Sequence, residues 1–367
     1  MEADMTDYIQ PKEIEKAREA LWKKYQGTSA VKASLFNLVI YTKDNVRKIY
    51  FEKIAQQVIR KFPCRIINIT EAENGTESYL RTFVSDLQPE NNTNSLFCDM
   101  TNFEVSGASR NIIPSLVIRH IQEDLPTYFL WADDPSKRDP IAIELKDLAT
   151  RVVFDSETAE SMTAFAKTLL ELHEKVECDI GDLNWARLAP WRGLFVQTFN
   201  DPEKLKSLRE SKDIRITYNM VATEQYCHTK IQATYFGAWI AIKLGWSYES
   251  SLGSKDEISF KYKSEHGPVT ISILAAKNDQ VLPGRILKFE SFSIHNEHLL
   301  LEKNRQNPLQ VKIQHSTSSR CEMPVYYLLD KETAGKSMIH EIYSQGTRGN
   351  FIDILKLISL YNSETIC

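Results

Sequence analysis

The sequence predicts two domains in a row, an α/β domain and then an α+β domain. The first is expected to hold an open, mostly parallel sheet with helices on both faces, and the second an antiparallel sheet. Up to about residue 180, short apolar runs of strand length alternate with amphipathic helical segments, a pattern typical of parallel strands. After Gly253, six strand-like runs follow one another with only polar turns between them, which indicates an antiparallel meander.

The first half divides into an N-terminal helical extension, residues 1–30, and the α/β domain, residues 31–180. A helix over 12–25 is expected to end before Gly27. Asp44 is a suitable N-cap for a helix whose apolar residues recur three or four positions apart as far as Val58. The expected strands are 35–41, 65–69, 79–84, 96–105, 128–131 and 152–154, and the further helices are 112–122, 141–148 and 158–176.

The second half, residues 181–367, is predicted to form the α+β domain. A helix should start at Pro190, since proline suits the first helical position. An alternating strand over 214–218 and an apolar helix over 231–242 follow. The meander, about residues 255–330, is expected to contain strands 258–262, 269–274, 286–294, 299–301, 311–314 and 325–329. Helices 337–343 and 351–360 close the chain.

Composition excludes several classes of function. The chain of 367 residues has a net charge of −4, which gives no electrostatic case for a nucleic-acid partner. Its N-terminus is acidic rather than signal-like, and its longest apolar stretch, residues 235–242, is far shorter than the ~20 residues that span a bilayer. We therefore expect a cytoplasmic protein without a membrane contact, with its six scattered cysteines as free thiols.

Motifs for cofactors, metals and nucleophiles are incomplete. None of the thirteen glycines satisfies G-x-G-x-x-G, and Gly335-Lys336-Ser337 copies only the end of a phosphate loop, with Asp330 where a glycine is needed. His295, His298 and His315 are better explained as turn histidines than as zinc ligands. Cys64 begins a buried strand, and no G-x-S-x-G motif is present. The sequence predicts no cofactor, no metal and no catalytic residue.

Acidic residues follow several expected strands: Asp44, Asp133, Asp134 and Asp155. In open α/β sheets, ligands bind outside the carboxyl ends of the strands, so these acids could line a crevice and bind sugar hydroxyls. Aspartates also occur there simply because they cap helices and turns. A sugar-phosphate-binding enzyme and a metabolite sensor are therefore the alternative functions.

The segment 182–192, DLNWARLAPWR, concentrates two of the six tryptophans and two arginines. Such a segment is either a packed anchor or a recognition surface. A buried guanidinium needs an acidic partner, which could be Asp182, a ligand phosphate or a carboxylate of another protein. The candidate partner-binding residues are Asp182, Asn184, Trp185, Arg187, Trp191 and Arg192.

This segment resembles the signature of the OpcA family, the glucose-6-phosphate dehydrogenase assembly proteins. Two further regions support the resemblance: residues 113–117 with 124–131, and residues 34–39 with Pro63-Cys64-Arg65. The resemblance covers roughly residues 30 to 250. It implies a protein that is not an enzyme and that binds glucose-6-phosphate dehydrogenase, promoting its assembly and activity in the oxidative pentose phosphate pathway.

Overall fold

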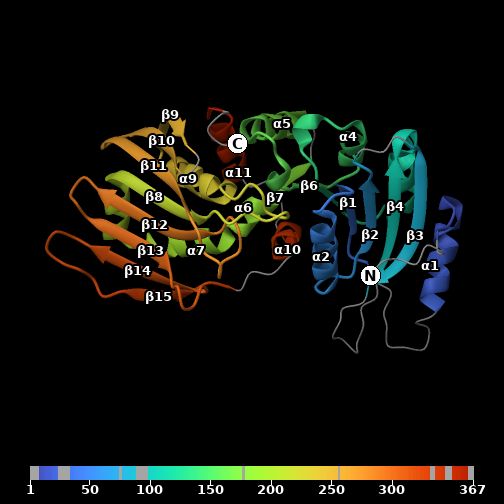
Figure 1. The fold of residues 1–367 in the computed structure, drawn as a ribbon, viewed down its shortest axis with the longest axis horizontal. Helices are drawn as coiled ribbons and strands as arrows, with labels where there is room; N and C mark the ends of the chain where they lie inside the picture. The colour runs from blue at the N-terminus through green and yellow to red at the C-terminus, as the bar shows by residue number, and fades with distance from the viewer. Residues whose placement is uncertain are drawn as a thin grey trace. The chain divides into compact units, whose positions relative to one another are not determined.

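The computed structural model describes residues 8–23, 34–73, 77–87, 98–175, 178–254, 257–330, 335–343 and 349–362 (Figure 1). The chain forms two compact units. Unit 1 comprises residues 1–155, 173–183 and 333–346, and unit 2 comprises residues 156–172, 184–332 and 347–367. The chain therefore passes between the units several times, whereas the sequence suggested a single boundary near residue 180.

Unit 1 contains a seven-stranded sheet in the order β3-β4-β2-β1-β5-β6-β7. Neighbouring strands are parallel except for the pair β3–β4. This confirms the expected mostly parallel sheet. The strands are β1 (Asn37–Lys43), β2 (Arg65–Glu71), β3 (Tyr79–Leu87), β4 (Cys98–Ser106), β5 (Thr127–Trp131), β6 (Arg151–Phe154) and β7 (Asp179–Asp182).

The helices of unit 1 lie on both faces of this sheet. The step from β1 to β2 and the step from β4 to β5 run in opposite directions along the sheet, so right-handed crossovers place their helices on opposite faces. One face carries α2, which packs against α10, and the other carries α3, which packs against α4. The bounds are α1 (Ile14–Lys23), α2 (Lys48–Ile59), α3 (Ile113–His120), α4 (Pro140–Lys146) and α10 (Lys336–Tyr343).

Helix α2 begins three residues later than predicted, with Arg47 rather than Asp44 as its N-cap. Asp44 does not cap it; instead the side chain of Asn45 accepts a hydrogen bond from the backbone N–H of Arg47, which precedes the first helical residue. Asp44 lies within reach of Lys48 Nζ, at 3.3 Å. The sequence pattern identified the helix but not its start, because several polar residues in this turn could serve as the cap. Residues 24–25 and 96–97, which end and begin two expected elements, lie outside the described residues.

Unit 2 contains an eight-stranded sheet in the order β15-β14-β13-β12-β8-β11-β10-β9. All neighbouring pairs are antiparallel except β8–β11, which is parallel. Strand β8 is inserted between β11 and β12, so the six predicted strands do not form one continuous meander. The strands are β8 (Ser211–Asn219), β9 (Ser247–Gly253), β10 (Glu257–Ser264), β11 (Gly267–Ala276), β12 (Ile286–Ser293), β13 (His298–Lys303), β14 (Gln310–Ser316) and β15 (Val325–Leu328).

One face of the eight-stranded sheet is covered by helices. Helix α9 lies over β8 and β11, and Gly237 allows its backbone to approach Ile216 and Ile271 closely. This shared apolar surface explains why β8 pairs with β11 although the two are far apart in the sequence. The helices that belong wholly or mostly to unit 2 are α5 (Met162–Lys175), α6 (Leu183–Arg187), α7 (Ala189–Thr198), α8 (Pro202–Arg209), α9 (Ile231–Lys243) and α11 (Gly349–Ile358). Across the described ranges, every helix is too short or too polar to cross a membrane.

Candidate functional site

The signature segment runs from the end of β7 through α6 into α7, and most of it is buried. Asp182, Asn184, Trp185, Arg187 and Trp191 are each no more than 7% exposed. Arg192 alone among the six candidate residues is half-buried. Five of the six side chains therefore contact the interior of the protein, and only Arg192 reaches its surface.

Asn184 is the centre of a buried hydrogen-bond network in unit 2. Its amide donates to Ser156 Oγ at 2.9 Å, and its Oδ1 accepts from Arg187 Nη1 at 2.8 Å and from Gln232 Nε2 at 3.1 Å. Gln232 Oε1 in turn accepts from Arg285 Nη1 at 2.9 Å. The network connects α6, α9 and the residue before β12, so it fixes how these elements meet.

Glu157 supplies the carboxylate of this network. It is 1% exposed, and its two oxygens accept from the backbone N–H of His228 at 3.0 Å and from the Asn184 amide at 3.4 Å. We missed Glu157, Gln232 and Arg285 in the sequence. Gln232 gave a usable signal, since it interrupts an otherwise apolar helix; Glu157 and Arg285 are far from the signature and gave none.

The two tryptophans of the signature are core residues of unit 2. The Trp185 ring stacks on Phe351 of α11, with ring centres 6.1 Å apart and planes at 20°. The guanidinium of Arg192 lies over the Trp185 ring, 3.5 Å from its centre. Trp191 meets Phe236 of α9 edge to face. These contacts hold α6 and α7 against α9 and α11.

A group of charged side chains lies at the carboxyl edge of the parallel sheet in unit 1. Lys43, the last residue of β1, places its Nζ 2.9 Å from Glu71, 3.5 Å from Asp139 and 3.8 Å from Asp133. Glu71 ends β2, and the two aspartates belong to the segment that follows β5. Carboxylates from the end of β2 and from the segment after β5 thus surround the lysine at the end of β1, the strand between them.

Arg110 and Tyr41 complete what we call the edge cluster: Tyr41, Lys43, Glu71, Arg110, Asp133 and Asp139. Arg110 contacts Glu71 at 3.2 Å and makes a close ion pair with Asp139. The Tyr41 hydroxyl donates to Glu71 and lies 3.2 Å from Asp139. Burial alone would raise the pKa of Asp139, but the hydrogen bond from Arg110 and the charge of Lys43 outweigh it and lower that pKa.

The four acids singled out in the sequence have different surroundings. Asp133 belongs to the edge cluster, and its burial raises its pKa. Asp134 is buried and accepts a hydrogen bond from the backbone N–H of Ser136, as the cap of a short 3-10 helix.

The other two acids belong to the turn after β1 and to the end of β6. The carboxylate of Asp44 is half exposed beside Lys48. Asp155 is fully buried, and its Oδ2 lies 2.5 Å from the guanidinium of Arg47. The structure thus brings only Asp133 together with the further charged residues Glu71, Asp139 and Arg110, which the sequence did not single out.

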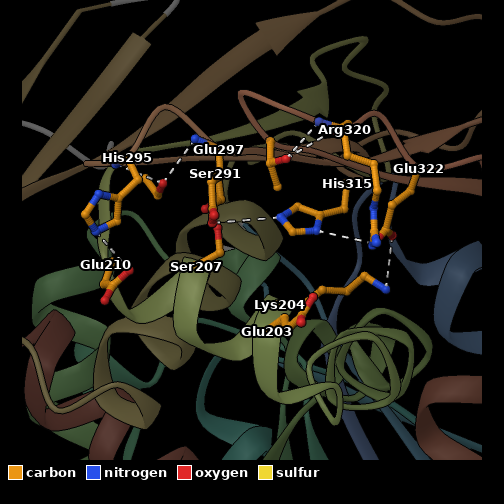
Figure 2. A network of polar contacts seen from close by, with 12 residues as sticks. Glu203, Lys204, Ser207, Glu210, Ser291, His295, Glu297, His315, Arg320 and Glu322 are labelled. Atoms are coloured by element: carbon orange, nitrogen blue, oxygen red, sulfur yellow. Dashed lines mark hydrogen bonds and ion pairs between the residues drawn. The ribbon is translucent and has the colours of Figure 1, made fainter.

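Figure 2 shows His295 and His315 within one network of polar contacts. His298 lies on β13, the strand that pairs with β14, which carries His315. His315 is buried, with Nδ1 3.8 Å from Glu322 and Nε2 3.9 Å from Glu297. His295 pairs with Glu210, and His298 stacks on the Phe292 ring. Among the described residues, no three histidine, cysteine or acidic side chains are grouped so that they could hold a metal ion. In Figure 2, Lys204 also reaches Glu322, at 3.5 Å, which ties α8 to the segment after β14.

The five described cysteines are free thiols: Cys64, Cys98, Cys178, Cys227 and Cys321. Cys64 and Cys98 are buried neighbours at the start of β2 and β4, and the backbone N–H of Cys64 lies 3.4 Å from Cys98 Sγ. A hydrogen bond between the two thiols and their burial raise the pKa of Cys64. Cys367 lies outside the described residues.

These two units define a fold class known from dehydrogenases. The chain is similar to a dehydrogenase from Chromobacterium violaceum, with a TM-score of 0.50 and 13% identity over 91% of this chain and 95% of that one. It is also similar to a 3-ketoreductase from Actinomadura kijaniata, solved with TDP-benzene and NADP, with a TM-score of 0.51 and 9% identity over 89% and 95% of the two chains. At such low identity, the likeness concerns the fold alone.

The chain belongs to the OpcA family. Residues 55–171 match the family's glucose-6-phosphate dehydrogenase subunit N-terminal domain, and residues 178–329 match the C-terminal domain. A relative from Nostoc punctiforme, provisionally named OxPP cycle protein OpcA, is 26% identical over 212 residues, which is 56% of this chain and 43% of the relative. The protein of the same name from Synechocystis is 27% identical over 197 residues, 53% and 40% of the two chains. The matches thus cover less than half the length of these relatives.

The turn between β1 and α2 does not suit the pyrophosphate of a dinucleotide. Doubly wound sheets that bind dinucleotides carry glycines there, so that backbone N–H groups can approach the phosphates. Here the turn is Asp44-Asn45-Val46-Arg47. The side chain of Asn45 accepts a hydrogen bond from the backbone N–H of Arg47, and the backbone carbonyl of Asn45 accepts one from the N–H of Lys48. Asp44 adds a negative charge to this turn. The residues present therefore do not fit the cofactor that the fold class implies.

Proposed function

We propose that this chain is a non-catalytic partner of glucose-6-phosphate dehydrogenase that promotes assembly of the active enzyme. One observation carries the proposal: the two family matches together span residues 55–171 and 178–329, and both are described as domains of a glucose-6-phosphate dehydrogenase subunit. The names of the relatives add a link to the OxPP cycle.

The geometry of the Asn184 network and of the edge cluster supports a binding role. In the Asn184 network, donors and acceptors from α6 and α9 bond to one another. In the edge cluster, the two cations face the three carboxylates at short range. Polar groups that satisfy one another keep the surrounding elements in fixed positions, whereas acid–base chemistry needs a group that is poised to exchange a proton with a substrate.

Such a partner would act by linkage. If it binds the active oligomer of the enzyme more tightly than the inactive form, it shifts the population toward the active oligomer by the difference in binding free energy. A tenfold preference corresponds to about 1.4 kcal/mol. No chemistry on the part of this chain is required.

The outer side of α7 is the part of the signature that we propose contacts the enzyme. Arg192 is half-buried there, and Val196 is 61% exposed on the following turn of the helix. The buried signature residues would then contribute indirectly, because they fix the position of α7. Arginine is common at the centres of protein interfaces, where its planar donors bind carboxylates.

The test combines this chain with glucose-6-phosphate dehydrogenase from the same organism. We expect the two to elute together at micromolar concentration and the initial rate of NADPH formation to rise. An Arg192→Glu variant should bind at least tenfold more weakly. Arg209→Glu, the same charge change at an exposed position of α8, should bind like the wild type. Separate elution together with an unchanged rate would refute the proposal.

A further inference from the structure

We infer that the edge cluster occupies the place where doubly wound sheets bind a nicotinamide dinucleotide, so that unit 1 keeps the fold but excludes the cofactor. The inference concerns unit 1 alone and is independent of the proposed partner. It goes beyond the missing glycine motif, because it identifies which side chains have taken the position of the ligand.

The place follows from the order of the strands. The parallel strands of unit 1 run β4-β2-β1-β5-β6-β7, which is the order of a dinucleotide-binding sheet. The order reverses beside β1, and ligands bind outside the carboxyl ends of the strands at that point. The edge cluster is built from the ends of β1 and β2 and from the segments that follow β4 and β5, so it lies at this position.

The charges of the edge cluster oppose a phosphate. Lys43 and Arg110 supply two positive charges, and Glu71, Asp133 and Asp139 supply three negative ones, which leaves one negative charge. Each cation already contacts at least two of the carboxylates. A pyrophosphate would have to displace these partly buried pairs, which would leave carboxylates without their cations in a poorly solvated place.

Glu71 adds a second obstacle. In dinucleotide-binding sheets, an acidic residue some twenty residues after the glycine-rich turn accepts hydrogen bonds from the ribose hydroxyls. Glu71 ends β2 and so stands in the comparable place, but its carboxylate is held by Tyr41, Lys43 and Arg110. Its acceptor positions are directed to the protein rather than to a ligand.

The first experiment measures thermal stability of the full chain with NADP⁺, NADPH, NAD⁺ or inorganic pyrophosphate. A ligand with a Kd of about 10 μM, added at about 1 mM, would raise the melting temperature by several degrees. We expect no rise with any of them. A saturable rise with a dinucleotide in the wild-type chain would overturn the inference.

The second experiment removes the negative charge of the edge cluster in a Glu71→Gln, Asp139→Asn double variant. Lys43 and Arg110 would then face only Asp133, so the site gains a net positive charge. We expect the melting temperature of the variant to fall and then to rise again with pyrophosphate, a response that the wild type lacks. Amide side chains keep the size of the carboxyls and the cap that residue 139 provides to α4.

The control is Glu52→Gln, Asp353→Asn, which makes the same change of net charge at two exposed positions. The control should not respond to pyrophosphate. If the double variant melts like the wild type and is unresponsive, the edge cluster does not exclude anions and the inference fails. If the control responds as strongly as the double variant, the response reflects overall charge, and the inference fails as well.

Discussion

Asn184 shows how a short side chain can connect distant parts of the chain. Its amide group bonds to Ser156, Arg187 and Gln232, which lie 28 positions before it and 3 and 48 positions after it in the sequence. All four side chains are buried. An asparagine has donors and an acceptor in one plane, so it can satisfy several polar groups that would otherwise be buried without partners.

Replacing Asn184 with alanine should therefore destabilise unit 2 strongly. The change removes four hydrogen bonds and leaves the donors of Arg187 and Gln232 in a buried place, so we expect a loss of about 2–4 kcal/mol. Thermal unfolding measures the effect. Ser318→Ala, at an exposed position of unit 2, is the control and should have little effect. Equal melting temperatures for Asn184→Ala and the wild type would contradict this role.

The ion pair of Asp139 predicts how the stability of the protein depends on pH. Because the ion pair with Arg110 lowers the pKa of Asp139 in the folded state, its contribution to stability is complete above the unfolded pKa of about 4. That contribution is lost as the pH falls through the folded pKa. The melting temperature of Asp139→Asn should thus lie below that of the wild type at pH 7, and the gap should narrow below about pH 4. A gap that stays constant from pH 7 to pH 3 would show that the charge of Asp139 is not involved; Asp279→Asn, an exposed change, is the control.

Several helices begin at an Asp-Pro pair that can be found in the sequence. Asp139 caps α4 and Asp201 caps α8, each accepting two backbone N–H groups, with proline at the next position. The aspartate satisfies donors that the first turn leaves open, and proline needs no donor there. Both pairs can be recognised in the sequence. Our prediction included the helix that follows the pair before α4, but it overlooked α8.

Strand β15 is an edge strand with apolar side chains exposed to solvent. Val325 is 64% exposed, Tyr326 52% and Leu328 69%, and the strand carries no charged residue. Edge strands without charges are prone to pair with other chains, because their outward backbone groups lack partners. The sequence identified this strand, but only the sheet order shows that it lies at an edge.

A lysine on this edge should reduce self-association. We expect Leu328→Lys to lower light scattering on heating or concentration, with a change in stability below about 0.5 kcal/mol, since the position is exposed. Ile49→Lys on α2 is a matched control: it places the same charge at a position that is 55% exposed on a helix. If both variants lower scattering equally, added charge rather than the edge explains the effect.

The whole molecule is interleaved, because the chain returns to unit 1 after completing most of unit 2. Residues 333–346 bring α10 back to unit 1, where Glu341 lies 2.5 Å from Arg151 of β6. Both side chains are buried. Gly181 of β7 has no side chain at this point, and a Cβ there would collide with the Glu341 carboxylate. Three distant segments thus depend on one another inside unit 1.

Glu341→Ala should therefore destabilise unit 1, although most of unit 2 precedes this residue in the chain. Removing one partner of a buried ion pair typically costs about 3–5 kcal/mol. Hydrogen exchange at the amides of β6 and β7 should accelerate, while exchange in β12 and β13 should stay near the wild-type rate. Asp353→Ala, an exposed acid on α11, is the control. Faster exchange confined to unit 2 would contradict this arrangement.

Local periodicity was enough to determine most of the elements and the two fold classes. Apolar runs of strand length and helical spacing depend on neighbours within a few residues, so they can be read along the chain. Strands β7 and β9 and helix α8 were missed. In β7, residues Asp179–Asp182 include a single large apolar side chain, which is too little for a recognisable strand pattern. The signature segment was likewise visible, since its tryptophans and arginines are close together in the sequence.

What the sequence by itself determined, then, was the identity of most of the elements and the location of the signature. The tertiary structure decided the rest: that β8 lies between β11 and β12, that α10 belongs to unit 1, and that most of the signature faces inward. It also decided that Lys43 and Arg110 meet carboxylates from positions 71, 133 and 139. The physical reason is that burial and charge pairing depend on distances in space, which residues far apart in the chain acquire only when the strands come together.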